Sequence, residues 1–191
     1  MHAFAPSDYG PVFSALLNGD RCRALDAGHP NETARGALEQ GTLAAAFAHD
    51  RIVDRDMAHC CLAGAWLLHD FLDESHAISQ GVETSSGSFW HAVMHRREGD
   101  FSNAKYWFRR VGTHEVLDEL GAHVTALAAD APSRALADRI APASRFDPYA
   151  MVDACQSAIR QAGAAEAICR QVQQAEWEQL FTHCYRGALG C

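Results

Sequence analysis

Apolar residues recur at helical spacing along nearly the whole chain, which predicts an all-α protein. β-branched residues form none of the alternating runs that strands need. With 191 residues, of which 48% are hydrophobic and 21% charged, the chain has the size and composition of one globular domain. We therefore expect a single-domain, all-α bundle of about seven or eight helices that spans residues 1–191.

Capping and turn residues divide the apolar pattern into helices. A first helix is expected at 8–17, ending at Asn18-Gly19, and a second begins at Asn31 and reaches about residue 49. The third, at 54–69, is apolar around its whole circumference, so we expect it to be the central buried helix. Beyond Gly112 we expect helices at 113–129, 148–161 and 164–185 and a short one at 133–140, with a minor lobe boundary as an alternative near 141–147. Asp147 is expected to cap the helix at 148–161.

Two stretches repeat the same punctuation at an offset of about thirty residues. His69-Asp70-Phe71 opens a stretch that closes at Gly81, and Gly99-Asp100-Phe101 opens one that closes at Gly112. In each stretch the Asp is expected to cap a new helix and the Gly to supply a left-handed turn at its end. Asp70–Gly81 and Asp100–Gly112 are therefore predicted to be the second arms of two helical hairpins. The side chains expected to be buried there are Trp66, Leu67, Phe101 and Phe108.

Residues 57–112 resemble two tetratricopeptide-like helical hairpins. An apolar helix at 89–97 leads into Gly99-Asp100-Phe101 and then Ala104 and Phe108, which is the spacing of such a repeat. The resemblance implies a concave helical surface that holds a peptide segment of a protein partner, without catalysis.

A second resemblance covers about 45 residues. The run FWHAVMHRREGDFSNAKYWFRRVG at 89–112, preceded by FLDESH at 71–76, is similar to a run in a family of uncharacterised bacterial and fungal proteins. It implies no activity, but it favours treating residues 69–114 as one unit.

Composition excludes several classes of protein. The formal net charge of −8 argues against nucleic acid or an anionic membrane as a partner. The seven cysteines are scattered without a C-x-x-C pair, which indicates neither a disulfide framework nor a zinc ribbon. The first residues lack a basic n-region followed by an apolar h-region, and no apolar stretch is long enough to span a membrane, so we expect a cytoplasmic protein.

Histidines gather in one part of the sequence: five of the eleven lie between residues 69 and 114. His91, His95 and Glu98 share one face if residues 89–98 form a helix, and two imidazoles and a carboxylate suit a divalent cation. A fourth ligand would come from the neighbouring hairpin. The candidates are His69, Asp73 and His76. A metal-binding protein is therefore one function that the sequence predicts.

Arginines and aromatic residues crowd the same segment. Residues 91–110 carry Arg96, Arg97, Lys105, Arg109 and Arg110 against only Glu98 and Asp100, a local charge of +3. One explanation is that these arginines complement helix C-termini. The other is a cleft that binds the carboxylate or phosphate of a small anionic ligand. Its predicted lining is Arg96, Arg97, Tyr106, Trp107, Arg109 and Arg110.

Histidine gives this predicted cleft two alternative uses. With His91 or His95 as general acid or base, the cleft would turn over its ligand, because the pKa of imidazole lies near neutrality. Without such a step it would be a binding site only. The anion cleft is the leading functional hypothesis from the sequence, ahead of the peptide-binding scaffold and the metal site.

Overall fold

All regular structure in the described parts of the chain, residues 4–127, 131–161 and 163–191 of a computed structural model, is helical. The all-α prediction is thereby confirmed. The described residues form eleven α-helices, more than the seven or eight expected. One reason is that the helix expected at 31–49 is broken at Gly41, after which the Thr42 hydroxyl accepts the backbone N–H of Ala45 and caps a new helix.

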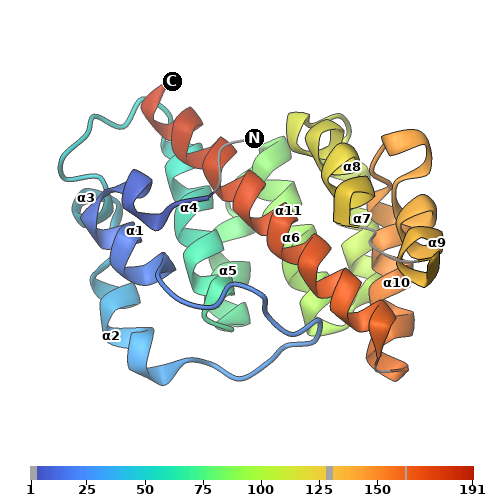
Figure 1. Ribbon diagram of the computed structural model, residues 1–191. Coiled ribbons are helices and arrows are strands. Elements are labelled where there is room, and N and C mark those ends of the chain that lie inside the picture. Colours follow the sequence, from blue (N-terminus) through green and yellow to red (C-terminus); the bar gives the residue numbers. More distant parts are fainter. Residues whose placement is uncertain (1–3, 128–130, 162) are drawn as a thin grey trace.

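The elements follow one another in this order: η1 (Pro6–Tyr9), α1 (Gly10–Leu17), α2 (Glu32–Gln40), α3 (Leu43–Ala46), α4 (Arg55–Leu68), α5 (Leu72–Ser79), α6 (Ser85–Glu98), α7 (Phe101–Val111), α8 (Glu115–Leu127), α9 (Ala131–Ile140), η2 (Pro142–Ser144), α10 (Pro148–Arg160) and α11 (Ala164–Leu189). The long helix α11 crosses the front of the bundle over α4 and α6, with α1–α3 at one end and α8–α10 at the other (Figure 1). The segment at 141–147, considered as a lobe boundary, contains η2, which packs against α8 and α9. Within the described residues, none of the helices is long and apolar enough to cross a membrane.

The two predicted hairpins are present as packed helix pairs, α4 with α5 and α6 with α7. The second is punctuated as expected: the Asp100 carboxylate accepts the Asn103 N–H at 3.0 Å, and the closing Gly112 has a positive φ of 64°. In the first hairpin both expectations are wrong, since the closing Gly81 is not among the residues with positive φ and the predicted cap is not formed. Asp70 has φ 64° and Phe71 takes the N-cap position, because the Asp70 carboxylate is bound instead by two arginines from elsewhere in the chain.

Helix α6 is more deeply buried than α4, which has the same length. Twelve of the fourteen α6 residues are buried, against eight of fourteen in α4, which sequence analysis placed at the centre. Leu67 and Phe108 are buried as predicted, whereas Trp66 and Phe101 are only partly buried. Trp66 packs edge-on against Phe71, with ring centroids 5.3 Å apart, at the margin of the core.

Candidate functional site: a three-histidine cluster

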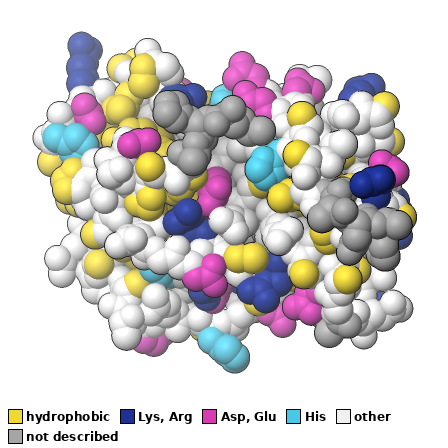
Figure 2. All heavy atoms as spheres, viewed as in Figure 1, with side chains coloured by type: hydrophobic (Ala, Val, Ile, Leu, Met, Phe, Trp, Pro, Cys, Tyr) yellow, Lys and Arg dark blue, Asp and Glu magenta, His cyan; other side chains and the backbone are white. Residues whose placement is uncertain are grey.

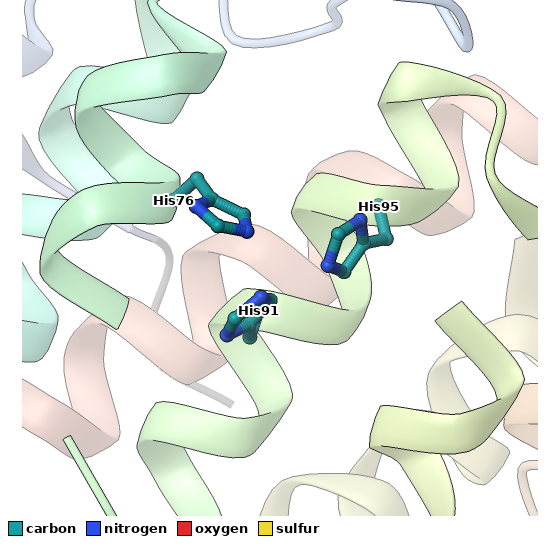
Figure 3. Close-up of side chains that lie close together, drawn as sticks. All are labelled: His76, His91 and His95. Carbon is teal, nitrogen blue, oxygen red and sulfur yellow. The ribbon is translucent and has the colours of Figure 1, made fainter. Parts of the chain in front are cut away.

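Three histidines of α5 and α6 come together beneath the surface. One ring nitrogen from each of His76, His91 and His95 lies within 4.8 Å of the others. His91 and His95 project from successive turns of α6, with ring centroids 4.7 Å apart, and His76 reaches them from α5, as Figure 3 shows. His91 and His95 are 2% and 5% exposed, whereas His76 is half-buried, so the cluster meets solvent on the α5 side.

The spacing of the three nitrogens is close to that of a metal site. A point within about 2.8 Å of all three exists when each pair is 4.8 Å apart or less, compared with about 2.0–2.1 Å for a Zn–N bond. To close that difference, each ring nitrogen has to move by less than about 1 Å. The three nitrogens of His76, His91 and His95 therefore lie less than about 1 Å from the distances that metal ligands have.

The buried ring of His91 has a nitrogen without a partner. Its Nδ1 is buried and makes no hydrogen bond in the described structure, which is unusual for a buried polar atom. The other contacts of the ring are aromatic: Trp107 stacks on it with centroids 4.0 Å apart. Burial, together with the neighbouring His95 and His76, lowers the pKa of His91 to about 3. His91 is thus held in the neutral form that a metal ligand requires.

His95 is fixed in one tautomer by its neighbours. The Glu98 carboxylate can only accept, so His95 donates its Nδ1–H to Glu98 Oε2 at 2.9 Å. Nε2 then carries the lone pair and accepts from Asn103 Nδ2 at 3.1 Å. A carboxylate that holds the second nitrogen of a histidine in this way is the usual support of a metal-ligating imidazole. Glu98, predicted as a ligand, lies where it orients His95 instead.

The candidates for the further ligand differ in position. His76 joins the cluster, and Asp73 is exposed one turn earlier on α5. His69 lies elsewhere: its Nε2 donates to the Leu16 carbonyl at 2.8 Å and its Nδ1 accepts from Asn31 at 3.1 Å. Both ring nitrogens of His69 are therefore engaged in holding the N-terminal segment to the bundle.

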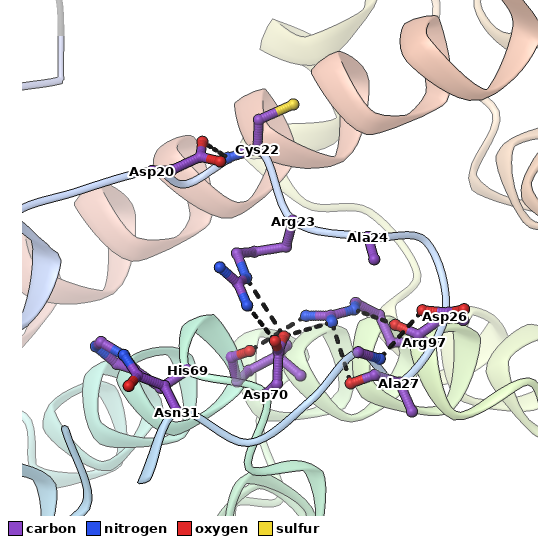
Figure 4. A network of polar contacts seen from close by, with 12 residues as sticks. Asp20, Cys22, Arg23, Ala24, Asp26, Ala27, Asn31, His69, Asp70 and Arg97 are labelled. Carbon is purple, nitrogen blue, oxygen red and sulfur yellow. Dashed lines mark hydrogen bonds and ion pairs between the residues drawn. The ribbon is translucent and has the colours of Figure 1, made fainter. Parts of the chain in front are cut away.

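The predicted arginine cleft is not assembled by the fold, because Arg96 and Arg97 point into the protein. Arg96 is fully buried and forms a two-bond ion pair with Glu176 of α11, which keeps its pKa above the ordinary value although burial lowers it. Arg97 bonds Asp70 at 2.6 Å and the carbonyls of Leu67 and Asp26 (Figure 4). These two guanidinium groups are occupied by intramolecular acceptors and do not face a ligand.

The other predicted cleft residues lie on α7. Tyr106, Arg109 and Arg110 are exposed, with Arg109 over the Tyr106 ring and Arg110 over the Trp107 ring. Neither Arg109 nor Arg110 has a carboxylate partner within the described residues. On the face shown in Figure 2, which α11 crosses, acidic and basic side chains are interspersed rather than gathered by sign. Of the predicted lining, only Trp107 contacts the histidine cluster.

Asn103 is the site residue that sequence analysis missed. It follows His95 by eight residues and comes from the next helix, so no helical spacing joins the two. The only local sign was its position three residues after the cap Asp100, which places it in the first turn of α7.

Comparisons of the chain with protein-family models, curated proteins and solved structures gave no match.

Proposed function

We propose that the protein binds a divalent transition-metal ion through His76, His91 and His95. The observation that supports this best is the convergence of three imidazoles from two helices, with the buried Nδ1 of His91 lacking a hydrogen-bond partner among the described residues. Leaving that atom unsatisfied costs about 1–3 kcal/mol, and coordination of an ion through Nδ1 removes the cost. Imidazole ligands suit zinc, copper, iron and nickel.

Three protein ligands give the ion the coordination of a catalytic rather than a structural site. Structural zinc sites are closed by four protein ligands, whereas catalytic sites keep one position for water or substrate. The half-buried His76 lies on the side from which a small molecule would enter. The activity we infer is therefore Lewis-acid chemistry on a small substrate, with the ion rather than a histidine acting as the reactive centre.

The test is metal binding by protein purified without a His tag. We expect one equivalent of Co²⁺ or Zn²⁺, lost in His91→Ala, His95→Ala and His76→Ala and retained in the matched control His29→Ala, an exposed loop histidine. Binding should weaken as the pH falls, because protons compete with the ion for the imidazole lone pairs. Less than about a tenth of an equivalent in metal-treated wild-type protein would refute the proposal.

A second readout locates the ion. Cu²⁺ bound by His91 would quench the fluorescence of Trp107, whose ring is stacked on that imidazole at 4.0 Å. Trp107→Phe should keep the stoichiometry of binding and lose most of the quenching. Equal quenching in Trp107→Phe and wild type would place the ion elsewhere.

Of the arginines predicted to line an anion cleft, only Arg109 and Arg110 are exposed. The exposed, carboxylate-free Arg109 and Arg110 favour attraction of an anionic substrate toward this part of the molecule. The tetratricopeptide-like peptide scaffold and the cytoplasmic location stay predictions.

A further inference from the structure

Asn103 is held beside the histidine cluster by the turn between α6 and α7. Its backbone N–H is bonded by the cap Asp100, and its side-chain amide reaches back across the hairpin to His95. Ser102, the preceding residue, is exposed and bonds only Asp100 in the described structure. Of these two neighbouring residues, only Asn103 forms a side-chain hydrogen bond with His95 in the described structure.

The amide of Asn103 lies in the direction in which His95 would bind a metal. Because Nδ1–H is given to Glu98, the lone pair of His95 is on Nε2, and Nε2 is the atom that Asn103 Nδ2 approaches to 3.1 Å. A metal–nitrogen bond of about 2.0–2.1 Å along that lone pair requires the amide to give way. Because the cap bond to Asp100 fixes the backbone of Asn103 beside His95, the displaced amide N–H groups would still adjoin the coordination position next to His95.

The charge of the site favours an anion in that position. Three neutral imidazoles leave the two positive charges of the ion uncompensated, and the nearby carboxylate of Glu98 is engaged with His95 and half-exposed. An amide N–H donates well to an anionic oxygen, and such charge-assisted bonds are the stronger ones. A carboxylate oxygen satisfies both the ion and the amide.

We propose that the open coordination position takes a small carboxylate and that Asn103 is its positioning residue, donating a hydrogen bond from Nδ2 to the metal-bound oxygen. This inference rests on the proposed metal site. It names the substrate class of that site as small carboxylates and assigns the recognition to Asn103 rather than to the arginines.

The experiment is titration of acetate into the Co²⁺-loaded protein, followed by visible absorption. In wild type the cobalt spectrum should shift with acetate. In Asn103→Ala the acetate affinity should fall about tenfold or more, since the loss of a hydrogen bond to a charged group weakens binding by at least about that factor. Co²⁺ affinity should be unchanged or higher, because the competing bond to His95 is gone. Ser102→Ala is the matched control and should behave as wild type.

The outcomes separate this inference from the metal site itself. If the wild type binds no Co²⁺, the proposed function fails. If Co²⁺ binds but acetate does not perturb its spectrum, the carboxylate class is wrong. Equal acetate affinity in wild type and Asn103→Ala overturns the role of Asn103, and so does a loss of Co²⁺ affinity in that variant, which would make Asn103 a ligand.

Discussion

The ion pair between Arg96 and Glu176 joins two helices of the core, α6 and α11. Both side chains are fully buried, and the carboxylate receives two bonds from the guanidinium group. Glu176→Gln preserves the size of the side chain but removes its charge. The variant therefore leaves the Arg96 cation in the core without a counter-charge.

The expected cost follows from this burial. Removing one partner of a buried ion pair destabilises a protein by about 3–5 kcal/mol. Arg96 Nε already lacks a hydrogen-bond partner within the described residues, so the variant adds to an existing deficit. For a chain of this length about 1 kcal/mol changes the melting temperature by about 2–4 °C, which gives a fall of about 6–20 °C. The double variant Arg96→Met, Glu176→Leu should recover most of the loss, because apolar replacements of a buried pair are often neutral or stabilising.

The assay is urea unfolding followed by circular dichroism. Glu178→Gln is the matched control: two residues further along α11, Glu178 pairs with Arg21 at 2.8 Å but is partly exposed. Loss of the Arg21–Glu178 ion pair should lower the free energy of unfolding by no more than about 1 kcal/mol. If Glu176→Gln is no more destabilising than Glu178→Gln, Arg96 is not a structural cation and its exclusion from the ligand site is wrong.

Two further variants test the packing and the titration of the fold. In Gly64→Ala the new Cβ would lie 2.7 Å from Trp90, so we expect the free energy of unfolding to fall by about 1–3 kcal/mol. The control Gly36→Ala, with open space around the new Cβ, should not destabilise the protein. Equal stability of the two variants would contradict the close approach of α4 to Trp90 of α6. Burial and the neighbouring His183 lower the pKa of His114 to about 4, below its unfolded value of about 6.5, so the unfolded state binds more protons and stability declines as the pH falls between these values. His114→Gln should make that decline shallower, and an unchanged slope would refute the assignment.

Local signals in the sequence predicted the helices and much of their punctuation. Asp100 and Asp147 cap α7 and α10 as expected, because a cap uses backbone groups only two or three residues away. Asp70 shows the limit of that reasoning. Its carboxylate is bound by Arg23 and Arg97, and a local capping bond loses to two charged partners that the fold brings in.

The roles of the arginines were decided by tertiary structure. Sequence analysis offered two explanations for Arg96 and Arg97, helix-end complementation and ligand binding, and neither includes a buried ion pair. The partner of Arg96 lies 80 residues away in the chain. Nothing periodic in the sequence relates residues at that separation, since which helix packs on which depends on the whole core.

The histidine site divides in the same way. The proximity of His91 and His95 follows from the helix itself, because residues four apart lie on one face at a separation that backbone hydrogen bonds impose. Glu98, three residues after His95, reaches it along the same helix. The place of His76 as the third member, and of Asn103 as a partner of His95, depends on how α5 and α7 pack against α6. Spacing along one helix is a property of the sequence, whereas distances between helices are set by the packing of side chains throughout the core.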